Sequence, residues 1–189
     1  MSTTPSTTSS PSCCQSKTAC AEPRQLGCVI ADTLKVTIFY GNEIVKSIPA
    51  DRFCEIPVKE INHPAFCIGH LAIYANRVLE LVGRDDLKYA MPFSDEHFKM
   101  GAPCLAQDGR YPSKEVLVAT FNGAWGVVAS VLPEINEATL ARANPMEGRM
   151  RERFPTVGSV VNFLCGAHNM MHIGQVSSWR RVAGLGSAM

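Results

Sequence analysis

The sequence carries almost no net charge. Its 18 Lys and Arg residues are balanced by 17 Asp and Glu residues, which leaves a formal charge of +1 at pH 7. No stripe of Lys and Arg alternates with aromatic residues, so nothing indicates a nucleic-acid-binding surface. The one short basic cluster, at 149–153, includes Glu152 and is typical of a solvated loop or helical turn.

Long apolar runs are missing as well. No stretch of about 18 uncharged apolar residues occurs, so we expect no membrane-spanning helix. The first residues lack the basic segment and following apolar segment that mark a secretory signal. We therefore expect a cytoplasmic protein that has no membrane partner. In such a chain the eight cysteines are expected to be reduced thiols rather than disulfides.

Residues 1–22 contain few apolar side chains and are dominated by Ser, Thr, Pro and Cys. Such a composition cannot bury enough apolar surface to offset the entropy lost on ordering, so we expect a disordered tail. Its cysteines, Cys13, Cys14 and Cys20, could bind a soft metal ion. No second Cys/His cluster completes a zinc-finger spacing, which favours a tail without metal.

Residues 23–189 are expected to form one helical domain. Of the whole chain 46% is hydrophobic, and the apolar residues recur at helical spacing without convincing β alternation. The pattern predicts an all-α fold, a four-helix bundle with helices at about 24–48, 62–83, 113–132 and 156–183. Asn62 and Ser113 are the expected N-caps of the second and third helices.

A long connection, residues 84–112, separates the second and third predicted helices. It is rich in Pro and Gly, and loops of this length are unusual inside a compact domain. A short loop forces neighbouring helices antiparallel, whereas a long crossover lets two consecutive helices run in the same direction. We therefore expect this segment to cross from one end of the bundle to the other.

Two histidines four residues apart, His168 and His172, lie on the expected inner face of the last helix. Positions i and i+4 share one face of a helix, so two imidazoles there can bind one transition-metal ion if a third ligand joins them. The best third candidate is His70 in the second helix. Three protein ligands leave an open position, which is typical of catalytic sites. The alternative is that these are hydrogen-bonded core histidines.

Three further residues are candidates for the surroundings of such a site. Gln175, one turn after His172, could orient a metal ligand or a bound water, or could be a packing contact between helices. Tyr74 and Arg77, one and two turns after His70, could line a pocket. The alternatives are core packing for Tyr74 and a surface ion pair for Arg77.

The other histidines are weaker candidates. His63 precedes His70 by two helical turns and is expected to be too far along the axis to share an ion. His97 lies in the long connection and could reach only one end of the bundle.

The segments Gly69-His70-Leu71 and His168-Asn169-Met170-Met171-His172-Ile173-Gly174-Gln175 resemble motifs of the DinB/YfiT-like superfamily. The resemblance extends over about residues 24–186. It implies a four-helix bundle in up-down-down-up order, frequent dimerisation, and a divalent ion, nickel or zinc, held by His70, His168 and His172. Some members of that superfamily are thiol-dependent S-transferases that use low-molecular-weight thiols such as bacillithiol or mycothiol.

Two functional hypotheses follow. The first is a metal-dependent thiol S-transferase acting on a small-molecule substrate, in which the ion activates a small thiol as a thiolate nucleophile. The second is a non-enzymatic metal-binding or stress-associated bundle protein without turnover.

Overall fold

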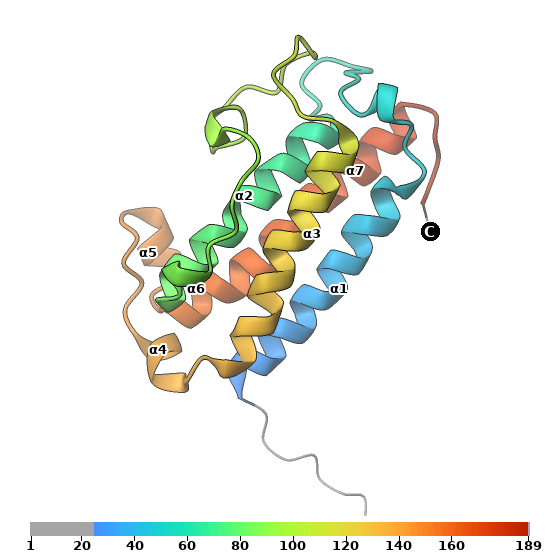
Figure 1. Cartoon of the computed structure of the whole chain (residues 1–189). Helices are drawn as coiled ribbons and strands as arrows, with labels where there is room; N and C mark the ends of the chain where they lie inside the picture. The colour runs from blue at the N-terminus through green and yellow to red at the C-terminus, as the bar shows by residue number, and fades with distance from the viewer. Residues whose placement is uncertain (1–24, 189) are drawn as a thin grey trace, which may run out of the picture.

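The computed structural model describes residues 25–188, and the regular secondary structure of this part of the chain is helical apart from one isolated β-bridge, which confirms the predicted all-α class. Three long helices, α1 (Leu26–Lys46), α2 (Pro64–Val82) and α3 (Lys114–Val131), lie beside a fourth helical stretch (Figure 1). That stretch consists of α6 (Val157–Phe163), a π-helical turn (Leu164–His168) and α7 (Asn169–Val182).

Shorter elements fill the connections. Helices α4 (Glu137–Ala141) and α5 (Arg149–Arg153) lie between α3 and α6, outside the four helices that the sequence predicts. The 3-10 turns are Ala50–Arg52, Asp85–Leu87, Asp95–His97 and Leu132–Glu134. The predicted tail, residues 1–22, lies outside the described residues.

Local capping chemistry fixes where the long helices begin. The prediction that Asn62 caps the second helix is wrong, because His63 occupies that position and its Nδ1 accepts from the backbone N–H of Phe66 at 3.1 Å. Ser113 caps α3 as predicted, and Thr156 forms a capping box at the start of α6.

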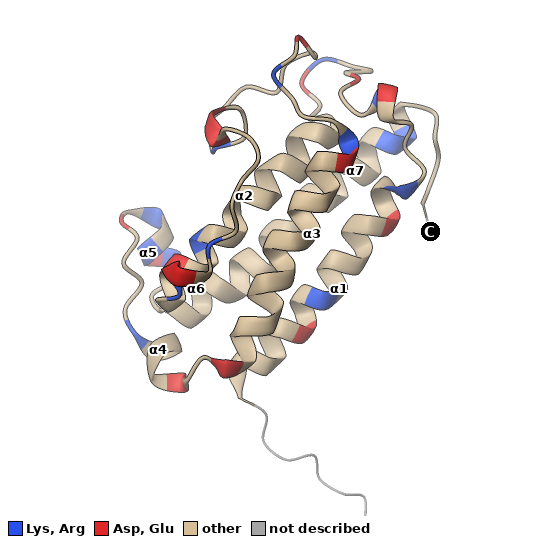
Figure 2. Ribbon diagram, viewed as in Figure 1, with Lys and Arg blue, Asp and Glu red and all other residues tan. Residues whose placement is uncertain are grey.

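The core lies between α1, α2, α3 and α7. Its largest fully buried side chains include Trp125 and Trp179, and the indole N–H of Trp125 donates to the carbonyl of Leu71 at 3.0 Å. Figure 2 shows the charged residues mostly in connections and at helix ends, with long uncharged stretches in α2 and α3. Burial of each large apolar side chain contributes about 1.5–3 kcal/mol, so this core is what holds the helices together.

Helix α2 and the stretch Lys114–Glu134 are long and apolar enough to cross a membrane by length and composition alone. In the folded protein 72% of the apolar window of α2 and 44% of the second window are buried inside the molecule. Their apolar residues contribute to the core, which is compatible with a soluble protein.

The fourth helical stretch is not the uninterrupted α-helix that the sequence predicts, because a π-helical turn separates α6 from α7. Such a turn alters the regular backbone hydrogen bonding. The carbonyl of Cys165 lies 3.0 Å from the Thr37 hydroxyl on α1 and 3.4 Å from the side-chain amide of Asn169. Because α1 supplies the nearer of these partners, it braces the segment that precedes α7.

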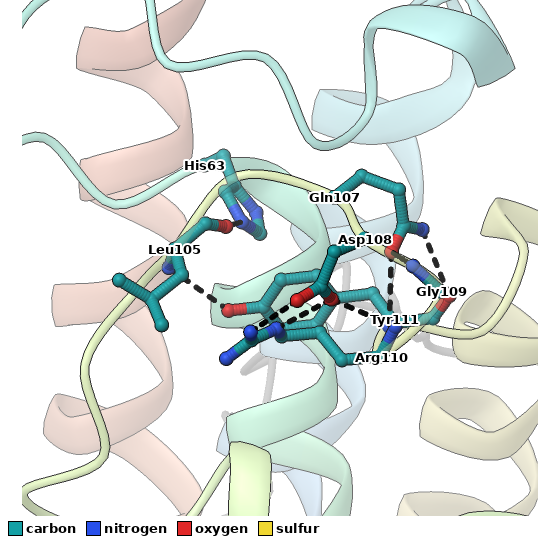
Figure 3. A network of polar contacts seen from close by, with 7 residues as sticks. All are labelled: His63, Leu105, Gln107, Asp108, Gly109, Arg110 and Tyr111. Atoms are coloured by element: carbon teal, nitrogen blue, oxygen red, sulfur yellow. Dashed lines mark hydrogen bonds and ion pairs between the residues drawn. The ribbon is translucent and has the colours of Figure 1, made fainter.

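The second half of the long crossover is held by its own polar contacts and by the start of α2 (Figure 3). The Nε2–H of His63 donates to the carbonyl of Leu105 at 2.9 Å, and the Tyr111 hydroxyl accepts from the backbone N–H of Leu105 at 3.0 Å. Gln107 bonds the backbone of both Gly109 and Tyr111. This network ties the crossover to α2 one residue before that helix begins.

Candidate metal centre

Three imidazoles from separate parts of the chain meet inside the fold. His70 comes from α2, His168 from the end of the π-helical turn and His172 from α7. One ring nitrogen of each lies within 4.8 Å of the others, and all three residues are buried. The ring centroids are 4.5, 4.9 and 5.3 Å apart. The structure therefore brings together the three histidines that the sequence predicts as ligands.

Hydrogen bonds fix the tautomers of two of these rings. Nδ1 of His70 lies 2.6 Å from the carbonyl of Phe98, and Nδ1 of His172 lies 3.0 Å from Oε1 of Gln175. A carbonyl oxygen only accepts, so Nδ1 must be the donor in each ring. In the neutral imidazoles this leaves Nε2 with its lone pair as the atom available to a metal ion.

The third ring is less constrained. Nε2 of His168 lies 3.3 Å from Nε2 of His70, and Nδ1 of His168 has no hydrogen-bond partner among the described residues. Two nitrogens that each lie about 2.0–2.1 Å from a tetrahedral ion are roughly 3.3–3.4 Å apart, so the separation of this pair fits a divalent ion. The same separation suits an N–H···N hydrogen bond between neutral rings, which is the arrangement expected without an ion.

All three histidines are held in the neutral form that metal binding requires. Burial lowers the pKa of His70 to about 4 and, with the neighbouring rings, lowers the pKa of His168 to about 3. Burial also lowers the pKa of His172, although the hydrogen bond with Gln175 acts in the opposite direction. At neutral pH the rings therefore do not need to lose a proton before they bind a cation.

The partner of His70 is supplied by the first half of the crossover. Phe98 is fully buried and packs on α2 at Gly69, where an added Cβ would lie 2.1 Å from Cε1 of the Phe98 ring. A glycine at this position lets the crossover approach closely enough for its carbonyl to reach His70. The sequence did not indicate Phe98, because the group that contacts His70 is a backbone carbonyl, which every residue has. Gly69, beside His70, was the available signal.

Gln175 connects α7 to the segment before α2. Its Oε1 accepts from His172 and from Nδ2 of Asn62, the latter at 3.1 Å, and lies 3.6 Å from Sγ of Cys67. The contact with His172 fits the role of orienting a candidate ligand, and the contact with Asn62 fits the role of a packing contact between helices, so both roles considered from sequence stay open.

A cavity of about 440 Å³ opens beside the histidine cluster. Tyr74 and Arg77 both line it, and the Tyr74 ring centroid lies 4.7 Å from that of His70 and 4.8 Å from that of His168. Most of the other lining side chains are apolar: Phe66, Met100, Met146, Met150, Phe163, Leu164 and Met171. The contribution of Met150 from α5 was not predicted, because no local pattern shows that this short helix lies at the cavity.

The remaining histidines do not belong to the cluster. His63 is buried as the N-cap of α2, and His97 ends a 3-10 turn in the crossover.

Arg77 also makes the ion pair considered from sequence, with Nη1 2.6 Å from Oε2 of Glu80. It therefore combines a surface ion pair with a place on the cavity wall.

Comparison with protein-family models places the chain in a known superfamily. A family model described as the DinB superfamily matches residues 42–176, which is more than half of the chain and includes all three histidines of the cluster. Neither the curated proteins nor the solved structures compared with the chain give a match.

Proposed function

Because the chain belongs to the DinB superfamily, we propose that it is a metalloenzyme, specifically a metal-dependent thiol S-transferase. The observation that carries the proposal is the convergence of three buried ring nitrogens within 4.8 Å of one another. The reaction class rests on the resemblance of the Gly69-His70-Leu71 and His168–Gln175 segments to superfamily members that transfer thiols.

In this proposal His70, His168 and His172 hold one divalent ion, nickel or zinc. A bound ion of this kind supplies Lewis acidity that lowers the pKa of a small thiol, so that the sulfur reacts as a thiolate. The chain contributes two fixed imidazoles, one oriented by the carbonyl of Phe98 and one by Gln175. These partners keep the ligand nitrogens in place without reorganisation.

The apolar cavity would receive the second substrate, an electrophile. Its Phe and Met side chains exclude water from the reacting atoms, and the ring of Tyr74 lies beside two of the imidazoles. In the overall reaction a sulfur–carbon bond forms and the bond from that carbon to its leaving group breaks. The thiol proton leaves to solvent.

The test is transfer activity with a panel of small thiols and an electrophilic chromogenic dye. We expect turnover by the native protein and its loss in the His172→Ala variant, because one of the three ligands is removed. His97→Ala is the matched control, since His97 lies outside the cluster, and it should keep the native rate. Equal rates for native protein and His172→Ala would refute the transferase.

A second candidate is a non-enzymatic metal-binding protein. The observation that favours it is that no Asp or Glu is among the described residues that line the cavity, so no carboxylate there could act as a general base. This candidate predicts that a chelator lowers the melting midpoint, because an ion bound to the native state stabilises it, while no thiol panel gives turnover.

Three further features remain proposals. The first is the up-down-down-up bundle, supported by Figure 1, in which the chain enters α2 and α3 from the same end. The second is a homodimer, which sedimentation equilibrium of the full chain would test. The third is the cytoplasmic location.

A further inference from the structure

We propose that the cavity beside the histidine cluster binds an organic monoanion, with an apolar body along the cavity wall and a carboxylate at its cationic rim. This rests on the proposed function only for the reaction at the histidine end. The binding itself requires the cavity and its charges, so it can be tested separately.

The size and chemistry of the wall define the apolar body. The volume of about 440 Å³ lies in the range of roughly 300–1,000 Å³ that is typical of small-molecule sites. Met146, Met150 and Met171 line it together with Phe66 and Phe163. Flexible thioether side chains adapt to aliphatic or aromatic ligands but offer few hydrogen bonds, so a sugar-like ligand would lose much of its hydration here.

The charges of the cavity have one sign. Arg77 and Lys99 line it, whereas no carboxylate does so among the described residues. Lys99 is exposed and forms no ion pair within the described part of the chain. Arg77 shares Glu80 with Lys88, whose Nζ lies 2.9 Å from Oε1 of that carboxylate. The adjoining depression is lined by Arg77, Lys88 and Lys99 and by Glu80 and Asp95, and Lys88 also pairs with Asp85 at 2.8 Å. An anion at the rim would therefore meet Lys99, whose charge no carboxylate neutralises among the described residues, beside Arg77.

The two ends of the cavity are separated along α2. Arg77, Lys99 and Tyr74 line both the cavity and the adjoining depression, whereas His70 lines only the cavity. Arg77 follows His70 by seven residues, which corresponds to about 10 Å along a helix. A carboxylate at the rim therefore places the opposite end of a medium-length chain at the imidazoles, where the proposed reaction takes place.

The test compares two ligands that differ only in charge. The fluorescent probe N-phenyl-1-naphthylamine is bound to the full chain and displaced by octanoate or by 1-octanol. We expect octanoate to displace it at a concentration about fivefold lower than 1-octanol, because only octanoate gains the cationic contacts. Lys99→Met should remove the preference for octanoate and leave the concentration of 1-octanol that displaces the probe unchanged. Lys59→Met changes an exposed lysine outside the cavity and should preserve the preference.

Arg77→Met provides a second variant and should also raise the concentration of octanoate that is needed to displace the probe. Displacement at equal concentrations by the two ligands, or a preference that survives in both Lys99→Met and Arg77→Met, would overturn the proposal. The second result would mean that the carboxylate binds elsewhere, for example at a metal ion. Repeating the titration after chelator treatment separates the two claims, because the preference should persist even if the protein holds no metal and transfers no thiol.

Discussion

At the scale of single residues, the candidate site depends on groups that fix two of its imidazoles. Gly69 leaves room for the Phe98 ring, and the Phe98 carbonyl then accepts a hydrogen bond from Nδ1–H of His70. Gln175 does the same for His172. The histidines supply the candidate ligand atoms, whereas other residues, Phe98 and Gln175, orient two of the rings.

Gly69→Ala tests this dependence. The added methyl group would overlap the Phe98 ring, so we expect a loss of stability of about 1–3 kcal/mol and weaker metal binding as the carbonyl moves away from His70. Thermal melting and a metal titration are the measurements. Gly126→Ala on α3 is the control, because a Cβ there would meet open space and alanine is the better helix former by about 1 kcal/mol. Identical behaviour of the two variants would contradict this view of Gly69.

How far the site could be predicted also depends on the kind of group. The i, i+4 spacing of His168 and His172, and the short motif around His70, were visible because they are side chains in a recognisable pattern. The capping role of His63 was not, since a histidine is an unusual N-cap and Asn62 beside it is a common one. The long-range partner of His70 is a backbone atom, and its position depends on tertiary packing alone.

At the scale of secondary structure, the π-helical turn is the feature that matters most for the site. It ends at His168, and the carbonyl of Cys165 within it lies near the hydroxyl of Thr37. Hydrophobic periodicity predicted the helix on either side but could not reveal the turn, since its apolar residues remain compatible with an α-helix. Turns of this kind frequently occur at functional sites.

Thr37→Val tests the brace from α1. The hydroxyl proton of Thr37 is shared among the carbonyl of Cys165 at 3.0 Å and those of Thr33 and Leu34 on its own helix at 2.9 Å. Valine has nearly the same shape but cannot donate to any of them, so we expect a loss of about 1–2 kcal/mol in the free energy of unfolding. Metal affinity should fall as well, because His168 loses its support. Urea unfolding measures the first effect and a metal titration the second. Thr33→Val, at an exposed position on the same helix, should change neither; if it matches Thr37→Val, the brace has no special role.

At the scale of the whole molecule, the burial of neutral histidines makes stability depend on pH. Burial lowers the pKa of His63, His70, His168 and His172 in the folded state. Because their unfolded values lie near 6.5, the unfolded chain binds more protons below that pH. The free energy of unfolding should therefore decrease as the pH falls below about 6.5.

For the metal-free protein we expect a loss of about 2 kcal/mol or more between pH 7 and pH 5. Urea unfolding in the presence of chelator, at a series of pH values, measures it. His97→Ala should show the same profile, because His97 is outside the buried set. A stability that stays constant from pH 7 to pH 5 would contradict the buried neutral state of these rings.

The most direct measurement of the central claim is the number of ions bound per chain. Full-length protein purified without an affinity tag is dialysed against nickel or zinc, and its bound metal is determined by elemental analysis. We predict one ion per chain for the native protein and for His97→Ala, and a large loss in each of the variants His70→Ala, His168→Ala and His172→Ala. Native protein that binds no ion, or three variants that bind as much as the native protein, would contradict the metal centre.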